Sequence, residues 1–415
     1  MIDHWQRTRP WYQIVTATCS LLVVVGGMVI VPPSAKAQDD GSSTFADAPA
    51  GSAVGVTGGG DGPTVWVTTL AADGAGSLRA LSAGSSPRTV GFAVSGTIEL
   101  REPIVIGSNV TIDGRGAAVD ISGSGLELRG STNVIIRNLR IHDGRADDSN
   151  LDAVSVLESS TGVWLDHLDL SSFPDGLLDV TQGSTDVTIS WSYLHDHGKA
   201  MLLGDANRAG HPDRADITVH HNRFENTGER NPMMRHGRFA VINNVVRNWG
   251  YDADSGYGMR IDCGALGWVE GNQFDHGENL RSVRVIAEDR CDAARLPALV
   301  LADNEIDDPR LVDPLRVEDV PTPQDITAEP LDQSLIDRID RFAGRLDVDG
   351  VGTEAPGPAS TADATGGGDM AGGGDEQDGP SPSSRGEGSR SWYLIVGVAM
   401  GVALTVGLRR LRGSR

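Results

Sequence analysis

Three aspartates in the middle of the chain have the type and spacing expected of a site for a hard cation. Asp152 precedes Asp175 and Asp179, which are four residues apart across a glycine turn, so the last two side chains could face one cleft. Clustered carboxylate oxygens without a cysteine among them suit Ca²⁺. Taken singly, each aspartate of this acidic chain is better explained as a solvated or turn-capping residue, so the metal hypothesis depends on the surrounding motifs.

Lys199 is unusual by residue type alone. The chain contains two lysines, Lys36 and Lys199, and every other basic residue is arginine. Lys36 lies in a segment that resembles an export signal, which would leave Lys199 as the single lysine of the mature protein. A lone lysine is consistent with a site that needs a compact ammonium group rather than a planar guanidinium. It is equally consistent with chance, and the count leaves both readings open.

The elements that must position these residues are short strands that recur along the middle of the chain. From about residue 65 to residue 308, β-branched runs alternate apolar and polar residues and end at a polar turn residue, often asparagine. The later turn asparagines are separated by 22, 28 and 32 residues: Asn222, Asn244, Asn272 and Asn304. Such a period, without a helical pattern, is typical of a solenoid. We predict an all-β parallel β-helix in which these asparagines form a ladder of side-chain amides.

Short helices are expected to cap the open ends of this solenoid. Residues 76–82 have the composition of one such helix. Residues 334–346 predict a second, against the far end, because apolar side chains recur there at helical spacing: Leu335, Ile336, Ile339, Phe342 and Leu346. The competing fold is a β-sandwich, which would need tight two-residue turns at regular short spacing, and we do not find them.

Several motifs, in order, resemble those of the calcium-dependent pectate lyases, the largest family of polysaccharide lyases. The resemblance covers roughly residues 65–278. Its more specific motifs are Val-Trp-Leu-Asp-His at 163–167, Asp-Gly-Leu-Leu-Asp at 175–179, Val-Thr-Ile-Ser-Trp at 187–191, His-Gly-Lys-Ala-Met-Leu-Leu-Gly at 197–204 and Arg-Asn-Pro-Met-Met-Arg-His-Gly at 230–237. The resemblance implies a right-handed parallel β-helix and an enzyme that cleaves polygalacturonate by calcium-assisted β-elimination.

The resemblance also assigns roles to individual residues. The calcium ligands of the family correspond to Asp152, Asp175 and Asp179, with Asn150 where many members carry another acid. An amide oxygen still ligates calcium but brings one charge fewer, so we expect a lower affinity. The residues that bind the substrate carboxylates correspond to Lys199 and Arg235, and the catalytic base to Arg230. Arginine is normally protonated, so the nearby cations would have to lower the pKa of this base.

Other functions are weighed against this one. A lyase acting on another polyuronide fits the same residues. A hydrolase of the polygalacturonase type needs carboxylates on both sides of the scissile bond, but Asp147–Asp148 is the only adjacent pair nearby and the expected His-Gly motif is absent. A non-catalytic, surface-anchored glycan-binding β-helix would not require Lys199, Arg230 and Arg235 together. A pectin lyase acting on methyl esters would not need the aspartates.

A histidine-bound transition metal is the alternative to calcium. His195 and His197 are two residues apart and so would share a strand face, and His220 and His221 follow one coil later. In the family that the motifs resemble, however, the position of His197 has no metal role. We therefore expect these histidines to be structural.

The ends of the chain have the composition of targeting segments and linkers. Residues 14–31 are almost wholly apolar, follow two arginines and precede an Ala-x-Ala cleavage pattern. Residues 392–408 are apolar, begin with tryptophan and tyrosine, and precede four arginines, as a membrane span obeying the positive-inside rule would. The predicted organisation is signal peptide 1–37, flexible linker 38–62, β-helix 63–312, C-terminal wrap with a capping helix 313–349, disordered Gly/Ser/Asp-rich linker 350–391, transmembrane helix 392–408 and basic cytoplasmic tail 409–415.

Composition limits the partners and the location. The 415 residues include 57 acidic and 35 basic side chains, a formal net charge of −22, which argues against binding to nucleic acid or anionic lipid surfaces. The expected partner is an acidic polysaccharide, and the expected form is a monomer outside the cell that touches the membrane through its C-terminal helix only. Beyond Cys19 in the leader, Cys263 and Cys291 could form one disulfide or remain as two thiols.

Overall fold

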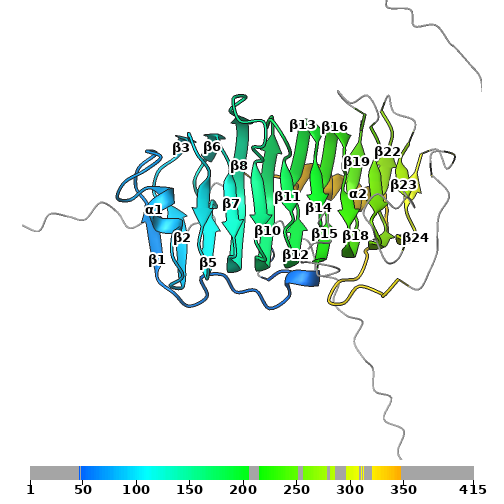
Figure 1. Ribbon diagram of the computed structural model, residues 1–415, viewed down its shortest axis with the longest axis horizontal. Helices are drawn as coiled ribbons and strands as arrows, with labels where there is room; N and C mark the ends of the chain where they lie inside the picture. The colour runs from blue at the N-terminus through cyan, green and yellow to red at the C-terminus, as the bar shows by residue number, and fades with distance from the viewer. Residues whose placement is uncertain are drawn as a thin grey trace, which may run out of the picture. The chain divides into compact units, whose positions relative to one another are not determined.

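The structure is a computed structural model that describes residues 46, 48–204, 215–250, 256–277, 281–285, 296–307, 310, 312 and 320–346. These residues form a right-handed parallel β-solenoid with few helices, as the repeat predicts (Figure 1). Contacts divide the chain into Met1–Pro358 and Ala359–Arg415, and no described residue falls in the second unit.

Two sheets, in which every pairing of strands is parallel, form the walls of the solenoid. The 8-stranded sheet contains β4 (Ile104–Ile106), β7 (Leu126–Arg129), β9 (Val154–Leu157), β11 (Leu178–Val180), β14 (Met201–Leu203), β17 (Met233–Arg235), β20 (Met259–Asp262) and β23 (Val283–Val285). These strands are neighbours in this order, so residues far apart in sequence lie side by side along the solenoid.

The 17-stranded sheet consists of two bands joined by the long strands β8 (Thr132–Gly144) and β10 (Thr161–Ser171), which pair in both. One band also contains β1 (Thr64–Val67), β2 (Arg88–Phe92), β5 (Val110–Asp113), β12 (Thr185–Ser190), β15 (Ala215–His220), β18 (Gly237–Ile242), β21 (Leu266–Glu270) and β24 (Ala298–Ala302). The other contains β3 (Gly96–Glu99), β6 (Val119–Gly123), β13 (Tyr193–Lys199), β16 (Arg223–Glu229), β19 (Val245–Arg247), β22 (Gln273–Asp275) and β25 (Glu305–Ile306).

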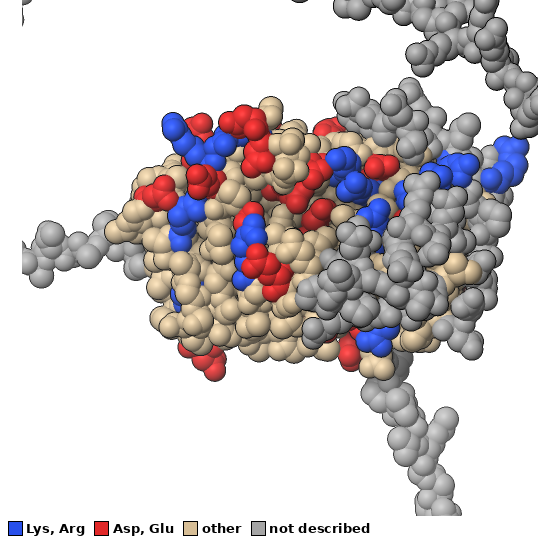
Figure 2. Space-filling view, viewed as in Figure 1, with Lys and Arg blue, Asp and Glu red and all other residues tan. Residues whose placement is uncertain are grey.

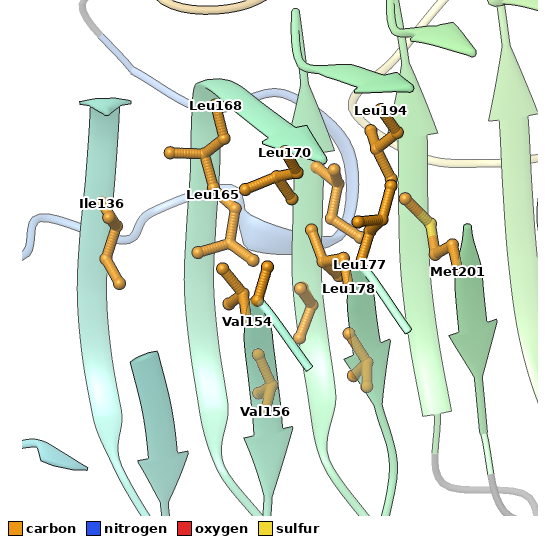
Figure 3. Close-up of a cluster of buried hydrophobic side chains, with 14 of the residues drawn as sticks. Ile136, Val154, Val156, Leu165, Leu168, Leu170, Leu177, Leu178, Leu194 and Met201 are labelled. Carbon is orange, nitrogen blue, oxygen red and sulfur yellow. The ribbon is translucent and has the colours of Figure 1, made fainter. Parts of the chain in front are cut away.

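The core consists of rows of apolar side chains that repeat from coil to coil. One buried row runs along the first band: Ile136, Leu165, Ile189, Val219, Val241 and Val269. Figure 3 shows Leu165 of this row facing Val154 and Leu178 of the 8-stranded sheet. Burying a side chain of this size contributes about 1.5–3 kcal/mol relative to leaving it exposed. A shift of one residue in a strand would expose its apolar side chains and bury its polar ones, so these rows fix the register of the strands.

The predicted asparagine ladder is confirmed. The Nδ2 atoms of Asn222, Asn244 and Asn272 each donate to the Oδ1 atom of the next asparagine at 3.0, 2.9 and 2.9 Å, and the last acceptor is Asn304. The same oxygens accept from the backbone N–H groups of the preceding coil at 2.8–2.9 Å. The residue before each ladder asparagine has a left-handed backbone, with φ between 49° and 65°. This turn directs the amides into the interior, where they satisfy one another.

The prediction that residues 38–62 form a flexible linker is wrong for residues 50–62. This segment packs along the outside of the solenoid and includes a 3₁₀ helix, Gly51–Ala53 (Figure 1). Its backbone N–H groups donate to side chains on successive coils, with Ala53 bonded to Thr188 at 3.0 Å and Gly59 to Thr111 at 3.0 Å. The row of outward-facing threonines therefore supplies hydrogen-bond partners that the segment's own composition does not reveal.

The two predicted helices are present, but one lies elsewhere than expected. Helix α1 (Leu78–Ser82) buries Leu78 in the core. Helix α2 (Gln333–Phe342) packs Leu335, Ile336 and Ile339 against Val245 on the side of the solenoid, not against its far end. After α2 the chain turns back toward earlier coils, where the backbone N–H of Leu346 donates to Asn138 Oδ1 at 2.8 Å. Val245, which follows the ladder residue Asn244, offers this apolar stripe a partner that periodicity alone cannot locate.

Some predictions concern other parts of the chain. The predicted signal peptide 1–37, linker 350–391, transmembrane helix 392–408 and tail 409–415 lie outside the described residues. Within the described part of the chain, no helix has the length and apolar character needed to cross a membrane. Cys263 is disulfide-bonded, and Cys291 is not among the described residues.

Candidate functional site

The outer face of the 8-stranded sheet carries the candidate residues. Its register places Ser155, Asp179, Leu202, Met233 and Arg260 beside one another on five successive strands. Acidic residues thus occupy the side of the earlier coils, and basic residues the side of the later coils. Figure 2 shows the acidic side chains near the middle of this face and basic side chains next to them. One surface therefore offers both cation ligands and groups that bind anions.

Two of the three predicted aspartates converge on one point. The carboxylate of Asp152 accepts hydrogen bonds from Gly176 N at 2.8 Å and from Ser155 Oγ at 2.9 Å, and Asp179 Oδ1 accepts from Leu202 N at 3.0 Å. A Cβ atom added to Gly176 would lie 2.9 Å from Asp152 Oδ1 and 3.1 Å from Asp179 Oδ1. The absence of a side chain at this glycine therefore lets both carboxylates approach the same small space.

The electrostatics of this pair suit a bound cation. Burial, followed by repulsion from Asp152, raises the pKa of Asp179 to about 8. Burial also raises the pKa of Asp152, and the Asp175 carboxylate adds to that effect. The positive charge of Arg230 opposes both shifts. Two partly buried carboxylates whose pKa values are raised by burial and by neighbouring carboxylates favour a nearby positive charge, which a divalent cation would supply.

Asp175 is oriented differently from the other two aspartates. Its carboxylate accepts a hydrogen bond from Lys199 Nζ at 2.7 Å, and its backbone carbonyl accepts one from His197 Nε2 at 2.8 Å. Burial, followed by the charge of Lys199, lowers the pKa of His197, so this imidazole is neutral near pH 7. The structure thus joins Asp175 to the predicted substrate-binding lysine, next to the Asp152–Asp179 pair.

Asn150, the fourth predicted metal ligand, is not joined to the pair. It is exposed, and its backbone N–H donates to Asp148 Oδ1 at 3.2 Å. Among the contacts of the described residues, none links its side chain to Asp152 or Asp179. Its role as a ligand stays a prediction.

Arg230 follows β16 at a sharp change of backbone direction. It has a left-handed backbone (φ 67°), precedes the cis peptide bond between Asn231 and Pro232, and its carbonyl accepts from Met201 N at 2.8 Å. A positive φ is uncommon in residues other than glycine, but it recurs at many turns of this solenoid, so the angle marks Arg230 as a turn residue. Its charge acts on both Asp152 and Asp179. The predicted base therefore lies next to the predicted metal ligands.

Arg235 shares a buried carboxylate with a residue that the sequence did not single out. Arg235 Nε donates to Asp262 Oδ1 at 3.2 Å, and an Arg260 nitrogen lies 2.8 Å from Asp262 Oδ2. Asp262 is 3% exposed, so it holds both guanidinium groups from beneath. The alternation Met259-Arg260-Ile261-Asp262 could have indicated that Arg260 faces outward in the next coil.

The histidines weighed for the alternative metal site contact other protein groups in the described part of the chain, and their structural role stays a prediction. His167 is buried with Nδ1 2.7 Å from Asp166, and His220 and His221 contact each other through their Nδ1 atoms at 2.9 Å. Within the described coils, one group of three side chains has potential metal-ligating atoms within 4.8 Å of one another. These side chains are exposed and lie on later coils: Asp275, His276 and Asp307. The expectation that the predicted histidines are structural agrees with these contacts.

The matched sequences share one description. A family model described as pectate lyase matches residues 44–293. A probable pectate lyase of Solanum lycopersicum is 34% identical over 55% of this chain and 62% of its own length. A pectate trisaccharide-lyase of Bacillus licheniformis is 33% identical over 54% of this chain and 66% of its own length, and a probable pectate lyase of Aspergillus flavus is 39% identical over 51% and 64%. The chain thus spans less than two thirds of the length of these relatives.

Solved structures agree on the fold. The major cedar pollen allergen aligns with 72% of this chain and 93% of its own, with a TM-score of 0.62 and 25% identity. A Bacillus pectate lyase in complex with trigalacturonate aligns with 71% of this chain and 98% of its own, with a TM-score of 0.56 and 22% identity. The second likeness bears on the solenoid alone, because its sequence identity is low.

Proposed function

The chain belongs to the pectate lyase family, and on that premise we propose that it is a polysaccharide lyase that cleaves polygalacturonate by β-elimination. The observation that carries the proposal is the convergence of Asp152 and Asp179 beside Arg230 on one sheet face. A cation site and a basic side chain are the two components that removal of a proton next to a carboxylate requires.

The residues of the chain would act on one uronate unit as follows. Lys199 and Arg235 bind carboxylates of the substrate and hold the sugar in the cleft. Arg230 takes the proton from C5, the electron pair forms the C4–C5 double bond, and the glycosidic oxygen leaves from C4. The leaving oxygen then takes up a proton from water and Arg230 returns its proton to water, so the products are one unsaturated and one ordinary sugar end. Arg260 lies on the outer face of the 8-stranded sheet, in the row that contains Asp179, and would bind a further carboxylate of the substrate.

The cation would be held by Asp152 and Asp179, with Asp175 and Asn150 as further proposed ligands. Both carboxylates approach the space above Gly176, and their raised pKa values support a preference for positive charge there, so the residues fit the cofactor. All the ligands are oxygen donors, which suits Ca²⁺ rather than a softer metal. When bound, calcium would withdraw electron density from the substrate carboxylate and so acidify the proton on C5.

The decisive assay measures ultraviolet absorbance of the unsaturated product during incubation with polygalacturonate. We expect absorbance to rise with calcium present, to stop when a chelator is added, and to resume when excess calcium is restored. Alginate serves as a second polyuronide with different sugars. Product from alginate but not from polygalacturonate would establish a lyase for another polyuronide, whereas retention on polygalacturonate without any product would indicate a non-catalytic glycan-binding protein.

We propose an extracellular location for the enzyme, with membrane anchoring through residues 392–408. The support is the apolar and basic composition of the terminal segments. Fractionation of cells that express the full chain would test this: we expect the protein in the membrane fraction and accessible to protease added outside the cells. A cytosolic protein would contradict both parts of the proposal.

A further inference from the structure

We propose that Glu229 is a positioning residue, whose carboxylate holds the Nε edge of Arg230 so that the terminal guanidinium nitrogens remain available to the substrate. The inference rests on the proposed function in so far as Arg230 is the base. Glu229 itself is not proposed to touch the substrate. It would act by restricting the rotation of the Arg230 side chain, which is proposed to touch the substrate.

The backbone brings these two residues to the same place. Glu229 is the last residue of β16 and is opposite Lys199 in the strand register. Its carbonyl accepts from Ala200 N at 3.0 Å, and the carbonyl of Arg230 accepts from Met201 N at 2.8 Å. Consecutive residues of a strand normally point to opposite faces. The left-handed backbone of Arg230 ends that alternation, so both side chains can lie on one side of the chain.

The contact between the side chains has a specific direction. Glu229 Oε1 lies 3.6 Å from Arg230 Nε, which is the closest approach of the two charged groups. Nε is shielded from solvent and has no hydrogen-bond partner within the described part of the chain. A buried N–H without an acceptor is costly, and a carboxylate at this distance needs only a small movement to accept from it. Because the approach is through Nε, it leaves the terminal nitrogens of Arg230 available to the substrate.

Glu229 and Arg230 do not form a typical surface ion pair. The side chains of Glu229 and Arg230 are 24% and 21% exposed, and the neighbouring cation Lys199 is bonded to Asp175 instead. An ion pair that served stability alone would contribute little. A catalytic group that must meet a C–H bond gains far more from fixed orientation, because proximity and alignment account for a large part of enzymatic rate.

The test compares Glu229→Ala and Glu229→Gln with Glu225→Ala as a matched control. Glu225 lies on the same strand and bonds Arg223 and Tyr193 at the other end of it. We expect Glu229→Ala to lower kcat about tenfold or more with KM changed about twofold or less. Glu229→Gln, which keeps an acceptor, should recover most of kcat, and Glu225→Ala should keep the wild-type kcat. Wild-type kcat in Glu229→Ala would overturn the inference, as would equal losses of kcat in Glu229→Ala and Glu225→Ala.

A second measurement does not depend on activity. Nuclear magnetic resonance of nitrogen-15-labelled arginine can follow the Nε–H of Arg230, assigned by its loss in Arg230→Lys. We expect slow exchange with solvent in the wild type and faster exchange in Glu229→Ala. Equal exchange would overturn the positioning role. Absence of product from any polyuronide in the wild type, with exchange still dependent on Glu229, would instead refute the proposed function alone.

Discussion

Two stacks of polar side chains on this solenoid differ in how they satisfy their charges and hydrogen bonds. In the ladder, Asn222, Asn244 and Asn272 repeat on neighbouring coils, and each amide supplies both a donor and an acceptor. In the candidate site, Asp152 and Asp179 also meet across coils, but ionised carboxylates only accept, and burial together with repulsion from neighbouring carboxylates raises the pKa of both. The same repeat thus produces a stack of amides that satisfy one another's hydrogen bonds at one place and a pair of carboxylates that favours a bound cation at another.

The largest effect is expected from Arg230→Lys. Lysine keeps the positive charge but not the planar group with its Nε edge, so turnover should fall below detection while calcium binding persists. Initial rates on polygalacturonate, together with calorimetric titration of calcium, would check this. Turnover near the wild-type rate would remove Arg230 from the role of base.

The carboxylate pair is tested by Asp179→Ala. Loss of one charged ligand should raise the calcium concentration at half-maximal rate by about tenfold or more. Asn150→Asp should shift it in the opposite direction if Asn150 belongs to the ligand shell. Calcium titrations of the initial rate measure both variants, and an unchanged midpoint in Asp179→Ala would refute the metal assignment.

The amide stack should respond in stability rather than in calcium dependence. Asn244→Ala leaves buried partners on both neighbouring coils without hydrogen bonds, which should cost about 1–3 kcal/mol in the free energy of unfolding. Denaturant unfolding measures the loss, and the calcium midpoint should equal that of the wild type. A large calcium shift in this variant would mean that the two stacks are not independent.

The smallest effect concerns pH in the absence of calcium. The pKa of Asp179 is about 8 in the folded protein, above the ordinary value of about 4 for an unfolded aspartate. The folded state therefore binds the extra proton, so stability should fall as pH rises toward 8. Melting temperatures in chelator at pH 7 and pH 8 should show this fall, and calcium should offset it. Asp179→Asn should weaken the dependence, which separates this carboxyl from other titrating groups; an identical slope in that variant would contradict the assignment.

The sequence predicts features that recur at equivalent positions of successive coils. The ladder follows from asparagines recurring at turns, whereas the spacing of Asp175 and Asp179 suggests that these two side chains could face one cleft, and the structure instead brings Asp152 and Asp179 together. The hydrogen bond between Asp175 and Lys199 could not be predicted, because the spacing of residues along the sequence does not determine the direction in which a side chain points. The sequence also missed Arg260, whose place beside the site depends on a register between distant strands. The course of residues 50–62 depends on threonines as far as 166 residues away.

Two segments that bond several coils along the solenoid axis change how the solenoid can unfold. In a plain repeat protein each coil contacts only its neighbours, so the ends can fray one coil at a time. Here residues 52–59 bond side chains from Thr218 back to Thr111, and the chain after α2 reaches from Trp191 back to Asn138. Opening one coil must therefore release contacts that span several others. The candidate site is thus built on coils that are tied together along the solenoid, so we expect the distance between the proposed calcium ligands and Arg230 to be held even though they lie on different coils.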